Sequence, residues 1–432
     1  MHSIDVSHHR AAELGPASPA SLWRNRNFMR MWAAQAVSLI GSSVTLVSLP
    51  IIAAAYLGAT PQQMGLLAAA GTAPGLLLRL PTAGWADARP NRIPVMVACN
   101  VVSGLLVASI PLLWSFGVLR FASLLVIALA MSAVSTVGGV FAAPVLPEIV
   151  AGDQLVDANG KFGTTRSIAE VSGRSLAGVL IHVVSAPLAV LIDAASFLVA
   201  AVLTQAVRVP PARRASAEGS ATLRGLAAGV ASLLGSSSLR AGVGAAAYLS
   251  FANGLVSALL VLYMVETLAL SEALVGPILG VGAVGGILGS LLVNTVHRRL
   301  GPGSTLTFAA AVLTLAFAGL PFGRPGPLGI LVCFTYELLG SFGAMLLVIT
   351  VFSEVPRRVP PSTIARSMAV MSLIPEGSSM LGALAGGALG AALGIRSALG
   401  ASFAFVLLAD AALALLLLSS RRRRAARDGG SP

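Results

Sequence analysis

Twelve long apolar runs, separated by short polar segments, make up most of this 432-residue sequence. Each run has about the ~20 residues that an α-helix needs to cross the hydrocarbon core of a bilayer. A segment inside lipid must satisfy its own backbone hydrogen bonds, which an α-helix does within itself. We therefore predict an all-α membrane protein with twelve transmembrane helices in two six-helix bundles. The runs lie at residues 28–57, 62–85, 94–115, 121–143, 162–184, 187–207, 240–268, 272–296, 304–322, 328–352, 363–393 and 397–417.

The composition indicates lipid rather than water as the natural solvent of the folded chain. Apolar residues make up 56% of the sequence and charged residues only 10%, whereas a soluble domain has about 25% charged residues. The net charge of +12 does not indicate nucleic acid, because the basic residues lie between apolar runs and not on one polar face with aromatic residues. Cys99 and Cys333 fall within apolar runs, and the five histidines have no metal-ligand spacing. We expect neither a disulfide framework nor a metal site.

The runs divide into two sets of six at residues 208–239, the longest polar interval. Within this interval, residues 223–234 have the pattern of an amphipathic helix lying on the membrane surface. The expected domains are a tail (1–27), a first bundle (28–207), a central loop (208–239), a second bundle (240–419) and a basic tail (420–432). Glu148 after the fourth run and Glu354 after the tenth stand in similar links. This internal similarity predicts two related bundles of the same topology.

The distribution of basic residues predicts the orientation, because Lys and Arg favour cytoplasmic loops. With the N-terminus inside, Arg120, Arg324 and Arg396 fall outside, Arg79 and Arg174 fall within runs, and the other 23 of 28 basic residues fall on the cytoplasmic side. We expect both termini in the cytoplasm and a location in the inner (plasma) membrane. The first run is followed by no small-residue cleavage site, so we do not expect a signal peptide.

A charged elbow follows the second run and reads Gly84-Trp85-Ala86-Asp87-Ala88-Arg89-Pro90-Asn91-Arg92. With the six-plus-six pattern and the central loop, it makes the chain resemble the major facilitator superfamily over nearly its whole length. Within that superfamily the chain looks most like the drug:proton antiporters of the macrolide-efflux and enterobactin-exporter type. The strings that carry this impression lie at residues 24–32, 155–159, 167–171 and 193–197.

Three positions depart from the family pattern. Ala83 stands where the family usually has Gly, and Ala88 stands where it usually has a basic residue. In the fifth run Arg174 replaces the proline of the exporters' Gly-Pro turn. The resemblance implies alternating access by two rocking bundles, driven by the proton gradient without any cofactor.

The resemblance also assigns a gating role to the elbow. Asp87 would cap or pair at the start of a neighbouring helix, while the basic residues would hold cytoplasmic acids or lipid phosphate. A similar basic segment follows the eighth run, at the matching place in the second set of six. The predicted gating residues are Gly84, Asp87, Arg89, Arg92, Arg298 and Arg299.

Ionisable residues within the runs are candidates for transport chemistry, because a charge costs about 2.5–3.5 kcal/mol at the centre of a bilayer. Glu170 and Arg174 lie four residues apart on one helix face and can pair; alternatively, Arg174 faces the cavity and binds an anionic group. Glu337 and Glu376 have no basic residue in their own runs at a spacing that would let the two pair. A desolvated carboxyl group binds a proton more readily, which suits proton coupling or attraction of cationic cargo. The alternative is a protonated acid hydrogen-bonded to a neighbouring helix.

Other polar residues within the runs have plainer expected roles. Asp193 and Asp410 are expected to pack between peripheral helices, and Arg79 to extend to lipid phosphate. Gln35 and Asn253 are expected to make interhelical hydrogen bonds or to serve as donors in the cavity. Glycine rows, including one at four-residue spacing from 382 to 394, suit either rocking contacts between the halves or static packing.

We expect a monomeric secondary transporter that exports a hydrophobic or amphiphilic small molecule, such as a drug or a siderophore-like metabolite, in exchange for protons. Besides this small-molecule substrate, we expect protons and membrane lipid as partners. We do not expect nucleic acid to bind. An importer with the same fold is one alternative, and a non-transporting membrane sensor is another. The sequence has no nucleophile–base spacing and no nucleotide loop, so an enzyme is not expected.

Overall fold

The computed structural model describes residues 22–89, 91–209, 223–360 and 363–428. In this part of the chain all regular structure is helical, and twelve helices are long and apolar enough to cross a membrane. The predicted all-α membrane fold is confirmed. The N-terminal tail up to residue 21 and the linker at 210–222 lie outside the described residues.

Six long helices form the first bundle, and short helical segments join them. The long helices are α1 (Arg26–Ile51), α2 (Pro61–Ala88), α3 (Ile93–Ser115), α4 (Phe121–Ala142), α6 (Leu155–Val184) and α8 (Leu191–Gln205). The short segments are η1 (Leu22–Arg24), η2 (Ile52–Tyr56), α5 (Val145–Ile149), η3 (Gly152–Gln154) and α7 (Ala186–Ala189).

The second bundle repeats this plan after the connecting helix α9 (Leu223–Leu234). Its long helices are α10 (Ser237–Leu262), α11 (Glu272–Leu300), α12 (Pro302–Ala318), α13 (Pro327–Arg358), α14 (Ile364–Leu393) and α15 (Ile395–Asp428). Its short segments are η4 (Tyr263–Thr267) and η5 (Leu320–Phe322).

Local sequence sets the helix starts in the first bundle. The Asn25 side chain accepts hydrogen bonds from the backbone N–H groups of Asn27 and Phe28, at 3.0 and 3.1 Å, and so caps α1. Thr60 and Gln63 form a reciprocal capping box at the start of α2, where Pro61 occupies the first turn. Pro is favoured there because the first turn has no intrahelical partner for its missing N–H.

The first helix of each bundle ends in the same irregular way. A five-residue π-helical turn follows α1 at η2, and another follows α10 at η4. In each, two backbone N–H groups just after the turn donate to the carbonyl oxygens of its first two residues. A residue with positive φ follows, Gly58 in the first bundle and Ala269 in the second. This matched irregularity agrees with the prediction of two related halves.

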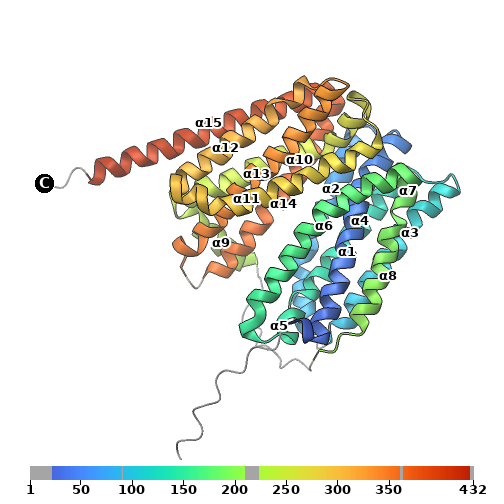
Figure 1. Ribbon diagram of the computed structural model, residues 1–432. Coiled ribbons are helices and arrows are strands. Elements are labelled where there is room, and N and C mark those ends of the chain that lie inside the picture. The colour runs from blue at the N-terminus through green and yellow to red at the C-terminus, as the bar shows by residue number, and fades with distance from the viewer. Residues whose placement is uncertain (1–21, 90, 210–222, 361–362, 429–432) are drawn as a thin grey trace, which may run out of the picture.

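The buried apolar residues form three clusters, and their membership shows how the bundles meet. The largest draws on both bundles, for example Val47 and Ile51 of α1 with Leu259 of α10 and Val275 of α11. The second lies within the C-terminal bundle alone, and the third within the N-terminal bundle alone. The bundles therefore share a core at one end only, and Figure 1 shows them diverging toward the end that carries α5 and α9. We name these the closed end and the open end.

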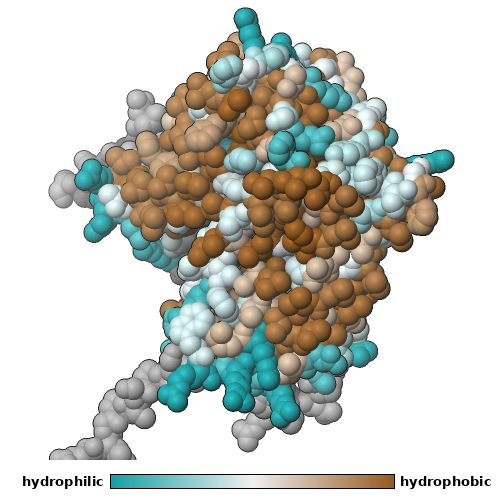
Figure 2. Space-filling model, turned by 45° about the vertical axis from the view of Figure 1, so that its right-hand side comes forward, coloured by the Kyte–Doolittle hydropathy of each residue, from teal (hydrophilic) through white to brown (hydrophobic). Residues whose placement is uncertain are grey.

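Large apolar side chains cover much of the outer surface. Among the most exposed are Leu77 (75%), Leu408 (71%) and Leu291 (69%). Figure 2 shows hydrophobic residues over most of one face, with hydrophilic residues gathered at its lower end and margins. This distribution fits a protein surrounded by lipid, in which apolar side chains face the hydrocarbon core.

The helix predicted within the central loop is present as α9, and it packs on the second bundle. Ser232 of α9 hydrogen-bonds Thr363 at the start of α14, at 3.3 Å, and Leu233 is 1% exposed. The twelfth span ends at Leu415, near the expected limit of 417, and the helix α15 continues without a break to Asp428. Arg is a good helix former, so the basic stretch extends the helix rather than ending it.

The glycine row of α14 packs mainly within its own bundle. A Cβ on Gly386 would lie 2.5 Å from the Leu255 carbonyl oxygen of α10, so this part of the row serves intrabundle packing. Gly390 also approaches the first bundle, since a Cβ there would lie 2.9 Å from the Pro61 Cβ. Further close approaches between the bundles involve glycines outside the row. A Cβ on Gly65 of α2 would lie 2.9 Å from the Gly387 Cα of α14, and one on Gly178 of α6 would lie 2.6 Å from the Ala273 carbonyl oxygen of α11.

Candidate transport site

A cavity of about 1240 Å³ lies between the bundles and is lined by residues of both. Most of its lining is apolar, and several hydroxyl-bearing side chains also line it. A large, mostly apolar cavity with a few convergent polar groups is the usual form of a small-molecule site. The charged residues that line it are Arg79, Arg166, Arg174, Asp193, Glu337 and Glu376.

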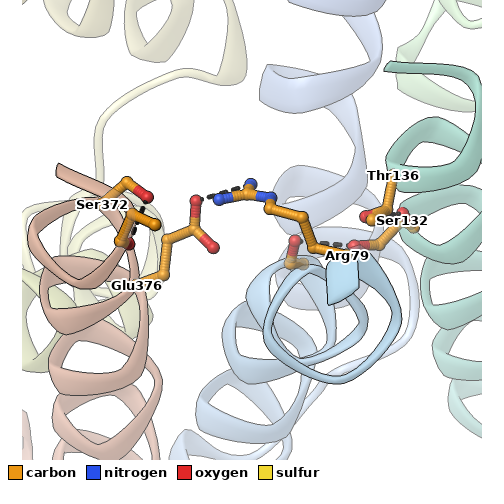
Figure 3. A network of polar contacts seen from close by, with 7 residues as sticks. Arg79, Ser132, Thr136, Ser372 and Glu376 are labelled. Carbon is orange, nitrogen blue, oxygen red and sulfur yellow. Dashed lines mark hydrogen bonds and ion pairs between the residues drawn. The ribbon is translucent and has the colours of Figure 1, made fainter. Parts of the chain in front are cut away.

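An ion pair joins the two bundles across this cavity. Arg79 Nη2 of α2 lies 2.8 Å from Glu376 Oε1 of α14, and Figure 3 shows the two side chains pointing toward each other from their separate helices. The expectation that Arg79 extends to lipid phosphate is wrong, and Glu376 is not unpaired. No sign of this pair was visible in the sequence, because its partners are 297 residues apart and lie in different bundles.

The predicted pairing of Glu170 with Arg174 is also wrong. Glu170 instead pairs with Arg166 one turn earlier, at 3.0 Å. Arg174 Nη1 donates a hydrogen bond of 3.0 Å to the Leu279 carbonyl oxygen of α11, across the bundle interface. Arg166 and Arg174 each lie four residues from Glu170, so the sequence allowed either pairing. The packing of α6 on α11 directs Arg174 toward the second bundle.

Glu337 lies in the cavity wall, on α13, and is partly buried. It interacts electrostatically with Arg174 of the opposite bundle, but within the described residues it has no hydrogen bond or ion pair. Its carboxyl group packs against α11, where a Cβ on Gly282 would collide with it. Glu337 is thus the lining carboxyl group with the fewest fixed partners.

The carboxyl groups of Asp193 and Asp410, on the peripheral helices, are held by neutral donors. Asp193 of α8 accepts hydrogen bonds from Thr45 at 2.5 Å, Ser196 at 3.1 Å and Ser42 at 3.3 Å, and its side chain is fully buried. Asp410 of α15 likewise accepts from Tyr248 and Thr314. The expected packing role of both acids agrees with these bonds, although Asp193 also lines the cavity.

The two amides have different positions. Asn253 lines the cavity, and its Oδ1 accepts a hydrogen bond of 3.4 Å from the Tyr336 hydroxyl. Gln35 of α1 is exposed and is not among the residues that line the cavity. It lies two turns before the lining residue Ser42, on the same helix face and nearer the open end. Its expected role as a donor in the cavity therefore stays a prediction.

The elbow lies at the open end, where the bundles are apart. Arg92 forms an ion pair with Glu148 of α5, within the first bundle. Arg89 stacks over the Trp85 ring, 5.2 Å from its centroid. Asp87 is exposed, as are Gly84, Arg298 and Arg299. In this conformation the elbow therefore braces its own bundle and does not connect it to the other.

The closed end has a polar contact that the sequence did not suggest. The Tyr56 hydroxyl, in the π turn of the first bundle, donates to Glu272 Oε2 at the start of α11, at 3.2 Å. These residues are 216 positions apart. An acid at the start of a helix and a tyrosine at the end of a span are common in membrane proteins. The sequence alone therefore gave no signal that Glu272 and Tyr56 meet.

Two bundles of six membrane helices around a shared, mostly apolar cavity with charged residues in its walls define a membrane transporter. The Major Facilitator Superfamily profile matches residues 31–374, which is more than half of the chain. The chain belongs to this superfamily. No curated protein matches its sequence.

Solved structures share the fold at low sequence identity. The chain is 12% identical to the nucleoside transporter NupG, with a TM-score of 0.74, covering 91% of this chain and 99% of that one. A bacterial homologue of the lysosomal transporter Spinster, inward-facing and occupied, is 16% identical, with a TM-score of 0.71 and coverage of 92% and 97%.

A third relative is solved in two conformations. A bacterial homologue of the iron transporter ferroportin is 20% identical in both. Its inward-facing structure has a TM-score of 0.72, covering 91% of this chain and 98% of that one. Its outward-facing structure has a TM-score of 0.55, with coverage of 90% and 99%. At these identities the comparisons establish the fold alone, and they do not single out the drug:proton antiporters.

Proposed function

We propose that this chain is a proton-coupled exporter of amphiphilic small molecules that works by alternating access in the plasma membrane. The observation that carries the proposal is the cavity between the bundles, which is sealed by a shared apolar core at one end and contains a carboxyl group without a hydrogen-bonding partner among the described residues. Rocking of one bundle against the other would expose this cavity to each side in turn.

The open end is assigned to the cytoplasm. The lysine and arginine distribution supports this assignment, because the loops with Arg120, Arg324 and Arg396 all lie at the closed end. The higher TM-score against the inward-facing ferroportin homologue than against its outward-facing form supports it as well. The structure then corresponds to an inward-facing state, from which an exporter loads its cargo.

Glu337 is the proposed proton carrier. As an ionised group it is attracted to Arg174 of the opposite bundle, and as a neutral acid it is not. Protonation therefore weakens an interaction between the bundles, and a buried charge that loses its partner is costly. Binding of the proton and binding of the cargo would in this way favour different arrangements of the two bundles.

Reconstituted flux tests this proposal. In liposomes with an internal pH dye, addition of cargo under a pH gradient should move protons with the wild-type chain, using a panel of cationic, neutral and zwitterionic drugs. Glu337→Gln should reduce this proton movement at least tenfold yet retain exchange of cargo without a gradient. Asp153→Asn, at an exposed carboxylate away from the cavity, should behave like wild type.

Direction and mechanism have separate readouts. Raised drug tolerance in a pump-deficient host supports export, and raised cellular accumulation would contradict it in favour of import. Absence of flux with every member of the panel would contradict transport of such cargo and favour the sensor alternative. Normal proton movement in Glu337→Gln would remove Glu337 from the coupling step.

A further inference from the structure

The charged side chains lining the cavity, apart from Asp193, are sorted by bundle. Arg79, Arg166 and Arg174 come from α2 and α6 of the first bundle, and Glu337 and Glu376 come from α13 and α14 of the second. Asp193 also belongs to the first bundle, but three hydroxyl groups already bond its carboxylate. The cavity therefore has one cationic wall and one anionic wall.

Both walls have unused hydrogen-bonding capacity. A guanidinium group carries five N–H donors, and Arg79 and Arg174 each have one hydrogen bond assigned, to Glu376 and to the Leu279 carbonyl oxygen. On the opposite wall, Glu376 Oε2 is buried without a partner among the described residues. Glu337 has none of its carboxylate oxygens hydrogen-bonded in that part of the chain. Donors thus remain on one wall and acceptors on the other.

The charge of a ligand decides how well it fits such walls. A cation that binds the glutamates takes acceptors from the arginines, and an anion that binds the arginines leaves the glutamates without donors. Either way a partly buried charge loses its partner, which is costly. A molecule with both a negative and a positive group replaces each lost contact with another of the same sign.

We propose that the cavity selects zwitterionic amphiphiles, binding the anionic group on the Arg79–Arg174 wall and the cationic group on the Glu337–Glu376 wall. The apolar part of such a molecule would lie against cavity side chains such as Leu46, Phe197 and Phe317. This inference rests on the proposed function only in taking the cavity as the cargo site.

Four forms of one molecule separate charge from size. The probes are the dipeptide of two phenylalanines (zwitterion), its C-terminal amide (cation), its N-acetyl form (anion) and its N-acetyl amide (neutral). Each is titrated up to 10 mM into the full-length chain in a non-ionic detergent at pH 7, with the thermal unfolding midpoint as readout, because a ligand bound to the folded state raises that midpoint. The zwitterion should reach half its effect at a concentration at least tenfold lower than any other form.

Two double variants should switch this preference in opposite ways. In Glu337→Gln/Glu376→Gln the anion should bind as well as the zwitterion, and in Arg79→Gln/Arg174→Gln the cation should do so. Unfolding midpoints without ligand show whether each variant is folded. If one double variant does not fold, the other double variant and the wild-type ranking still decide.

Other outcomes overturn the proposal. Equal binding of all four probes would make the charge pairs structural links between the bundles only. Preference of the wild type for the cation, or no shift with any probe, would also reject it. Since this assay needs no proton movement, zwitterion binding without flux would contradict the proposed function alone, and flux with charge-blind binding would contradict this inference alone.

Discussion

Individual buried carboxyl groups in this protein have very different surroundings. Asp193 is surrounded by three hydroxyl donors, whereas Glu376 faces an arginine and Glu337 has no fixed hydrogen bond in the described chain. Bonds from neutral donors hold a carboxyl group in place, while an interbundle charge pair depends on how the bundles are arranged. Asp193 is therefore suited to stabilising a bundle, and the two glutamates to responding to bundle motion.

We predict that Thr45→Val destabilises the first bundle. Valine has nearly the shape of threonine but lacks the hydroxyl that donates to Asp193 at 2.5 Å in a fully buried site. Leaving a buried acceptor short of a donor costs about 1–3 kcal/mol. Ser42→Ala should cost less, because its bond is 3.3 Å long and the serine is less buried. Thermal unfolding in detergent measures both losses.

The matched control for this prediction is Thr164→Val. The Thr164 hydroxyl is exposed and bonds only the Gly160 carbonyl oxygen of its own helix. Its removal should leave the unfolding midpoint within error of wild type. Equal losses at residues 45 and 164 would show that the hydroxyl bond to Asp193 contributes nothing specific.

At the scale of helices, the backbones of the two bundles approach closely at the interface between α6 and α11. Gly178 and Gly276 lie against each other there: a Cβ on Gly276 would lie 2.6 Å from the Gly178 amide nitrogen. Real Cβ atoms are not found so near to backbone atoms, so these two helices touch only because both positions lack side chains. The same reasoning applies to Gly65 and Gly387 between α2 and α14.

We predict that Gly178→Val shifts the protein away from the conformation described here. The valine side chain cannot fit against α11, so the closed end should separate and the open end should close. Spin labels at Val156 and Leu300, which are exposed at the open ends of α6 and α11, report this change in a background without the two native cysteines. The mean distance between the labels should shorten.

Gly163→Val in the same helix is the control. A Cβ at residue 163 would meet nothing within 4 Å, so the distance distribution should match that of the parent. A shortened distance in this control, or an unchanged one in Gly178→Val, would contradict the role of the α6–α11 contact in setting the conformation.

For the whole molecule, the elbow is informative because it is not engaged between the bundles. Arg92 pairs with Glu148 inside the first bundle, while Asp87 is exposed at the open end. In the proposed alternating access, closure of that end would bring the elbow close to the second bundle. Asp87 is then the elbow acid still available for a new contact.

We predict that substitution of Asp87 impairs transport, whereas substitution of Arg92 impairs stability. Asp87→Asn should insert normally and keep the wild-type unfolding midpoint, but lose transport at least tenfold, because it acts in the conformation closed at this end. Arg92→Ala should lower the unfolding midpoint, since Glu148, 23% exposed at its side chain, loses its partner. Liposome flux and thermal unfolding measure the two effects, and full transport by Asp87→Asn would remove the elbow from gating.

The sequence by itself determined the class of fold. Long apolar runs can satisfy their backbone in lipid only as helices, so the number of spans, their approximate limits and the division after the sixth follow from hydropathy. The elbow and the resemblance that it carries led to the superfamily that the profile match confirmed. These features are local or periodic, and each is visible within a few tens of residues.

The tertiary structure decided which charges meet. Glu170 pairs with Arg166 and not with Arg174, and Arg79 pairs with Glu376 across 297 positions. The physical reason is that interbundle contacts depend on the rotation of each helix about its axis, and packing of the whole bundle fixes that rotation. The sequence could thus list the ionisable residues of the spans, but only the assembled bundles placed arginines on one wall of the cavity and glutamates on the other.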